Sequence, residues 1–172
     1  MASSGISLPT AIIVPQPGHL RLSSHKYDIV LAAAARPGTG AEDKWPLYAG
    51  IGEIIGRLGK VAFLPHRDAD IGTIGERELG QRMQRIISGS VDLVLYYAGI
   101  GSLAARIALI TACDRNVPVT FFYEHCNQRL YEETVRSLEL PQRTERIMFE
   151  KEDEALSRLE ESLKMFYDDE VH

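Results

Sequence analysis

Residues 28–33 read Asp-Ile-Val-Leu-Ala-Ala, and this short apolar run is the stretch that decides the fold. A strand that is buried on both faces of a sheet produces such a run, because neither face needs polar side chains. A loop containing Gly and Pro follows at residues 36–40, and apolar residues then recur at helical spacing over residues 47–58. The order of strand, loop and helix is the first half of a strand–helix–strand unit.

The same alternation repeats along the rest of the chain. Further apolar runs predict strands at residues 61–65, 91–96, 117–122 and 146–149. Helical spacing predicts helices at residues 74–88, about 102–113, 132–138 and 153–166. Strands that alternate with helices form right-handed crossovers and a parallel sheet. We therefore predict an α/β fold, a flavodoxin-like doubly wound sandwich with a five-stranded, mainly parallel sheet of order 2-1-3-4-5 and helices on both faces.

The chain length of 172 residues suits one folded domain. We assign residues 26–167 to that domain. Residues 1–25 are rich in Ser, Pro and Gly, which predicts a loosely ordered N-terminal arm. Residues 168–172 form an acidic tail in this interpretation.

The composition excludes several functional classes. With 19 Lys and Arg against 24 Asp and Glu, the net charge is −5 and no basic run is present, so we expect no nucleic-acid partner. The longest apolar run, near residues 29–35, is too short to span a membrane, and the N-terminus lacks the pattern of a secretion signal. Two cysteines make no disulfide framework or zinc motif. We expect a cytoplasmic protein with no membrane contact, no metal and no cofactor.

A ligand site is expected where the strand order reverses, beyond the carboxyl ends of strands 1 and 3. In the loop after strand 3, Gly99 and Gly101 let the backbone approach a ligand closely, and Ser102 offers a hydroxyl group at a helix N-terminus. The alternative is a tight turn in which Ser102 is only an N-cap. Beyond strand 1, Arg36 and Thr39 have the same two interpretations.

Three polar residues, His66, Arg67 and Asp68, follow the second strand. They suit a ribose or a phosphate, with Arg67 as the residue that can bind a phosphate through two hydrogen bonds. A solvated loop with an Arg67–Asp68 ion pair is the alternative.

The order of these segments resembles that of the nucleoside 2-deoxyribosyltransferase-like superfamily. The resemblance covers residues 27–122 and rests on a first strand that ends in small residues, Val-Ala-Phe-Leu-Pro-His-Arg-Asp at 61–68, Ser-Val-Asp-Leu-Val-Leu at 90–95, a Gly-rich turn, a helix and Val-Pro-Val at 117–119. This superfamily includes deoxynucleoside 5′-monophosphate N-glycosidases and cytidine monophosphate hydrolases.

The resemblance implies a nucleophilic Glu on the helix after strand 3, whose carboxylate attacks the anomeric carbon, and an assisting Asp on the preceding helix. This sequence has no Asp or Glu between Ser102 and Ala112, and none within residues 81–85. Glu76 and Glu78 lie earlier in the preceding helix. Arg106, one turn into the helix after strand 3, favours an anionic ligand or is an ordinary surface Arg.

We therefore predict a domain that binds a nucleoside or nucleotide without the standard glycosyl-transfer activity. The alternative is an active N-glycosidase or deoxyribosyltransferase that uses a relocated carboxylate, for which Asp68 and Glu78 are the catalytic candidates. The resemblance also implies a homodimer or a higher oligomer.

Overall fold

The computed structural model describes residues 27–170, so the predicted N-terminal arm lies outside the described residues. One five-stranded sheet runs through the domain in the order β2-β1-β3-β4-β5, as predicted. The strands are β1 (Ile29–Ala32), β2 (Ala62–Phe63), β3 (Leu93–Tyr97), β4 (Val119–Glu124) and β5 (Thr144–Phe149). Every pairing between neighbouring strands is parallel.

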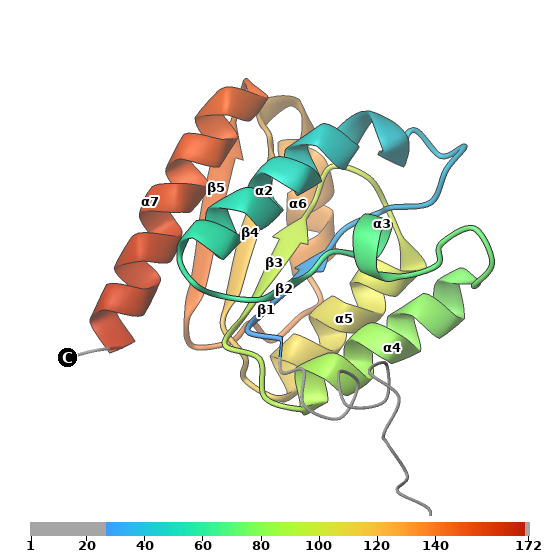
Figure 1. Ribbon diagram of the computed structural model, residues 1–172, viewed down its shortest axis with the longest axis horizontal. Coiled ribbons are helices and arrows are strands. Elements are labelled where there is room, and N and C mark those ends of the chain that lie inside the picture. Colours follow the sequence, from blue (N-terminus) through green and yellow to red (C-terminus); the bar gives the residue numbers. More distant parts are fainter. Residues whose placement is uncertain (1–26, 171–172) are drawn as a thin grey trace, which may run out of the picture.

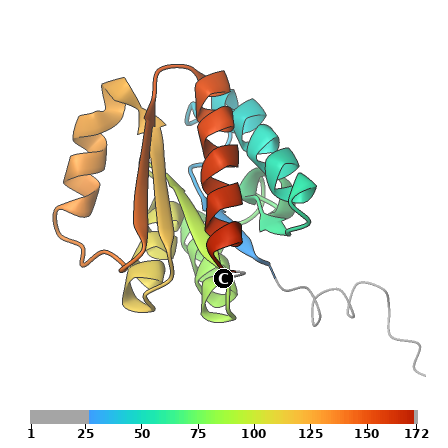
Figure 2. The ribbon, with the colours of Figure 1, turned by 90° about the vertical axis from the view of Figure 1, so that its left-hand side faces the viewer.

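Helices cover both faces of the sheet (Figure 1). One face carries α2 (Trp45–Arg57) and α7 (Glu152–Glu170), and the other carries α4 (Glu76–Ser88), α5 (Leu103–Asp114) and α6 (Gln128–Val135). Seen from the side, α6 and α7 lie on opposite sides of β4 and β5 (Figure 2). The short elements η1 (Ala41–Lys44), α3 (Pro65–Asp68) and η2 (His125–Asn127) follow β1, β2 and β4.

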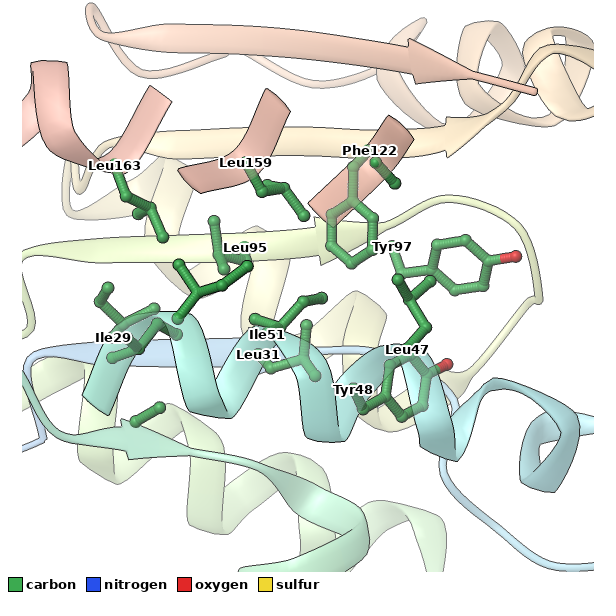
Figure 3. Close-up of a cluster of buried hydrophobic side chains, with 14 of the residues drawn as sticks. Ile29, Leu31, Leu47, Tyr48, Ile51, Leu95, Tyr97, Phe122, Leu159 and Leu163 are labelled. Carbon is green, nitrogen blue, oxygen red and sulfur yellow. The ribbon is translucent and has the colours of Figure 1, made fainter. Parts of the chain in front are cut away.

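The side chains of β1 alternate between two buried clusters, one on each face of the sheet. Ile29 and Leu31 pack against α2 and α7, whereas Val30 and Ala32 pack against α4 and α5. Figure 3 shows the first cluster, in which Leu159 and Leu163 of α7 lie above the sheet. Burial on both faces explains why residues 29–33 contain no polar side chain.

Two segments differ from the sequence interpretation. Residues 65–68, predicted as strand end and polar loop, form the short helix α3, because Pro65 suits a first helical position and the Asp68 carboxylate accepts a hydrogen bond from the Leu64 N–H (2.8 Å). Helix α7 continues to Glu170, so the acidic residues 168–170 extend a helix instead of forming a tail. Phe166 is buried, and the Tyr167 hydroxyl donates a hydrogen bond to Asp92 (3.2 Å), which anchors this last turn.

Candidate functional site

A cavity of about 220 Å³ opens at the carboxyl ends of β1 and β3, where the strand order reverses. Four residues that the sequence analysis singled out, Arg36, Thr39, Gly101 and Ser102, line it together with Ala34, Glu76 and Leu103. The structure thus brings the loop after β1 and the loop after β3 to one site. Such a position is where doubly wound sheets hold their ligands.

Glu76, the first residue of α4, supplies the carboxylate in this cavity. Its Oε2 accepts hydrogen bonds from the Ser102 hydroxyl (3.0 Å) and from the Ala104 N–H (3.0 Å). Ser102 is the N-cap of α5, and its hydroxyl oxygen accepts a hydrogen bond from the Ala105 N–H (3.2 Å). Two side chains from different elements therefore cap the same helix N-terminus.

A glycine in α4 explains why Glu76 reaches α5. Gly80 lies one turn after Glu76 on the same side of α4, and a Cβ atom at Gly80 would lie 2.5 Å from Ile107 Cδ1 and 3.3 Å from Ala104 Cα. The two helices therefore approach more closely than any larger residue would permit. The sequence signal that could have indicated this contact is Gly80 itself, a glycine inside a helical pattern.

A second polar cluster lies at the ends of β3 and β4, and we call Lys44, Tyr97, Glu124 and Glu152 the Glu124 cluster. The Lys44 Nζ lies 2.6 Å from Glu124 Oε1 and 3.1 Å from Glu152 Oε1. The Tyr97 hydroxyl lies 2.6 and 2.7 Å from the two carboxylate oxygens of Glu124. Glu124 was not among the site residues predicted from the sequence.

Burial and charge oppose each other in the Glu124 cluster. Burial acts to raise the pKa of Glu124, but hydrogen bonds from Lys44 and Tyr97 outweigh it and hold that pKa below its usual value. Burial likewise acts to lower the pKa of Lys44, and its two carboxylate partners raise it instead. Burial, reinforced by the hydrogen bond to Glu124, raises the pKa of Tyr97, which therefore stays neutral.

Two aromatic side chains of α2, Trp45 and Tyr48, pack against the loop after β1. The Trp45 Nε1–H donates to the Ala35 carbonyl (3.0 Å), and the Tyr48 hydroxyl donates to the Ala34 carbonyl (2.9 Å). In Figure 3 the hydroxyl groups of Tyr48 and Tyr97 lie at the end of the buried cluster toward which the β3 arrow points. Trp45 and Tyr48 therefore hold the loop against the core.

His66 packs beside both of these aromatic side chains. Its ring centroid lies 6.0 Å from that of Trp45 and 5.6 Å from that of Tyr48. Its Nδ1 is buried and has no hydrogen-bond partner among residues 27–170. Burial and the nearby Arg67 charge lower the pKa of His66. An uncharged imidazole fits this environment.

The remaining predicted residues lie apart from the cavity. The Arg67 guanidinium binds both oxygens of Asp68 (2.8 Å each), so these two residues form the ion pair that was the alternative interpretation. Glu78 and Arg106 are exposed and do not line the cavity. Gly99 packs on the Tyr97 ring, because a Cβ there would lie 2.0 Å from the Tyr97 hydroxyl oxygen.

A larger, open hollow of about 780 Å³ lies between the C-terminal ends of α4 and α5, at the opposite edge of the sheet, and no predicted site residue lines it. Within residues 27–170, no group of three or more His, Cys, Asp and Glu side chains is placed to hold a metal ion. No helix in this range is both long enough and apolar enough to cross a membrane.

The sequence matches no protein-family model and no curated protein. Solved structures of two other proteins are among those that share its fold. The CMP N-glycosidase BcmB of Clostridium botulinum superimposes with a TM-score of 0.56 at 16% sequence identity, over 76% of this chain and 95% of that one. The solution structure of BlsM superimposes with a TM-score of 0.65 at 17% identity, over 84% of this chain and 94% of BlsM.

At these identities the likeness concerns the fold alone. The chain shares the fold of BcmB and BlsM, with the five-stranded parallel sheet of order 2-1-3-4-5 that the order of its sequence motifs predicted. The shared fold alone does not assign the enzymatic activity of BcmB to this chain, because function depends on the side chains of the site.

Proposed function

We propose that this chain binds a nucleoside or nucleotide in the cavity between the loops after β1 and β3. The observation that carries the proposal is the cavity itself, which lies at the switch point and is lined by Arg36, Thr39, Glu76 and Ser102. A guanidinium, a carboxylate and hydroxyl groups are the side chains that recognise a sugar or a phosphate. The shared fold with a CMP N-glycosidase supports this ligand class.

We further propose that the chain lacks the standard glycosyl-transfer activity. The cavity-side turns of α5 carry alanine at positions 104, 105 and 108, and all three side chains are buried. A carboxylate nucleophile on this helix is the group that the covalent route requires. Without it, binding would proceed without cleavage of the glycosidic bond.

The test combines equilibrium binding with an assay for base release on the full chain. We expect calorimetry to detect binding of at least one nucleoside or 5′-monophosphate, and chromatography to detect no free base above a control without protein. Arg36→Ala should weaken binding about tenfold, or about 1.4 kcal/mol. Arg129→Ala, at a residue of α6 that is 91% exposed, is the matched control and should leave the affinity unchanged. Absence of binding across the panel would overturn the proposal.

One observation favours a second candidate function, an N-glycosidase with a relocated carboxylate. Of the acidic residues in the described range, Glu76 lines the cavity, whereas Asp68 is paired with Arg67 and Glu78 is exposed. Release of free base that is lost in Glu76→Gln and retained in Asp68→Asn and Glu78→Gln would establish this function. Base release that survives Glu76→Gln would exclude Glu76 as the nucleophile.

We also propose that two copies of the chain associate through α5. Leu103 and Ile110 lie two turns apart on this helix and are 52% and 39% exposed, and Leu103 borders the cavity. Exposed apolar side chains on one helix face are common in subunit interfaces. Light scattering should report a dimer that Ile110→Glu converts into a monomer. A monomeric wild-type chain would contradict this proposal.

A further inference from the structure

We propose that Glu76 makes the cavity select an uncharged nucleoside over its 5′-monophosphate. This inference rests on the proposed function and narrows its ligand class. Three features of the cavity support it: two of the helix amides that an anion would use are already bonded, the carboxylate next to them is fixed, and the free oxygen atoms of the lining side chains are acceptors.

Two of the first N–H groups of α5, those of Ala104 and Ala105, are already bonded to the protein's own side chains. A helix N-terminus binds phosphate through its first free N–H groups. Here the Ala104 N–H donates to Glu76 Oε2 and the Ala105 N–H donates to the Ser102 hydroxyl oxygen. The carboxylate of Glu76 thus stands where a phosphate would bind.

The charges that line the cavity also disfavour a second anion. Glu76 is half-buried and held by two hydrogen bonds, from Ser102 and Ala104. Arg36, the cation of the cavity lining, is exposed and pairs with no carboxylate within residues 27–170. Repulsion from a fixed, partly desolvated carboxylate is stronger than attraction to a flexible cation in water. The net effect is a penalty on a phosphate dianion.

The oxygen atoms of the Ser102, Thr39 and Glu76 side chains suit hydroxyl donors. The Ser102 hydroxyl donates its only hydrogen bond to Glu76, and the Thr39 hydroxyl donates its only one to the Arg36 carbonyl (2.6 Å). Both hydroxyl groups can therefore only accept a hydrogen bond from a ligand. Glu76 Oε1 has no hydrogen-bond partner in the described part of the chain. A sugar hydroxyl can donate to this oxygen, whereas a phosphate dianion has only acceptors to offer.

The experiment compares a nucleoside with its own 5′-monophosphate, so that base and sugar stay constant. Calorimetry at neutral pH measures both dissociation constants for the wild-type chain, for Glu76→Gln and for Glu139→Gln. Glu139 is an exposed residue between α6 and β5, and its substitution removes the same charge at the opposite edge of the sheet. We expect the wild type to prefer the nucleoside about tenfold or more, Glu76→Gln to lose most of this preference, and Glu139→Gln to keep it.

Each outcome decides between the proposals. A wild-type chain that binds the monophosphate as well as or better than the nucleoside would overturn the inference and leave the proposed function intact. An unchanged preference in Glu76→Gln would remove Glu76 as its cause. If neither ligand binds to any of the three proteins, the proposed function fails and this inference fails with it. The wild-type comparison tests the inference even if Glu76→Gln does not fold.

Discussion

At the scale of single residues, the ammonium group of Lys44 lies between the carboxylates of Glu124 and Glu152. We expect these two ion pairs to stabilise the folded state. The side chains of Lys44 and Glu124 are only 23% and 14% exposed, so solvent screens their attraction incompletely. Removing one partner of such a pair leaves the other charge without compensation. We expect Lys44→Ala to lower the free energy of unfolding by about 1–3 kcal/mol at neutral pH, as measured by urea denaturation.

This loss should depend on pH. The pKa of Glu124 is lowered in the folded state, so its stabilising contribution is present above its unfolded-state pKa of about 4.3 and disappears as the pH falls through the lower folded value. The difference between wild type and Lys44→Ala should therefore shrink below about pH 4. Arg129→Ala, which removes an exposed i,i+4 ion pair, should change stability by less than about 0.5 kcal/mol at any pH. A difference that stays constant down to low pH would contradict the role of Glu124.

Gly99 is a second residue on which the site geometry depends. A Cβ atom at this position would lie 2.0 Å from the Tyr97 hydroxyl oxygen and 2.1 Å from Tyr97 Cζ. Tyr97 is buried and bonded to Glu124, so its ring cannot move away cheaply. We expect Gly99→Ala to cost about 1–3 kcal/mol in thermal or chemical unfolding. Gly101→Ala, where the added Cβ meets no atom within 4 Å, should cost less than about 0.5 kcal/mol; equal losses would refute the steric explanation.

At the scale of elements, the contact between α4 and α5 positions the cavity carboxylate. Gly80→Ala would place a methyl group 2.5 Å from Ile107 Cδ1 and push the helices apart. We expect a loss of about 1–3 kcal/mol, although alanine favours a helix over glycine by about 1 kcal/mol. Gly56→Ala in α2, where the added Cβ meets open space, should stabilise the protein by about 0.5–1 kcal/mol. Stabilisation by both substitutions would show that the helices are not in close contact.

Local patterns predicted the elements and failed to predict the contact between them. Apolar runs and helical spacing gave the five strands and their order, because burial on both faces leaves a clear signature. Helix α3 was missed, since the four residues of Pro65–Asp68 are too few to show a helical period. Glu76 was not chosen as a site residue because its partner Ser102 is 26 positions away, and periodicity does not tell which helices approach each other.

At the scale of the whole molecule, the sheet separates two buried clusters that share its strands. Trp45, the only tryptophan of the chain, packs against the cluster under α2 and α7. Met83 of α4 is fully buried in the cluster on the other face. Because β1 and β3 contribute side chains to both clusters, a defect on one face should weaken the other.

We therefore expect Met83→Ala to shift the unfolding of the whole domain. The truncation should cost about 2–4 kcal/mol, because it leaves a cavity in a closely packed region. The fluorescence of Trp45, on the opposite face, and the far-ultraviolet circular dichroism should move to the same lower urea midpoint. Met165→Ala, at a side chain that is 67% exposed, should leave both midpoints unchanged. If the Trp45 transition stayed in place while the circular dichroism split into two steps, the faces would unfold separately. In that case the strands β1 and β3 would not couple the two buried clusters, although they contribute side chains to both.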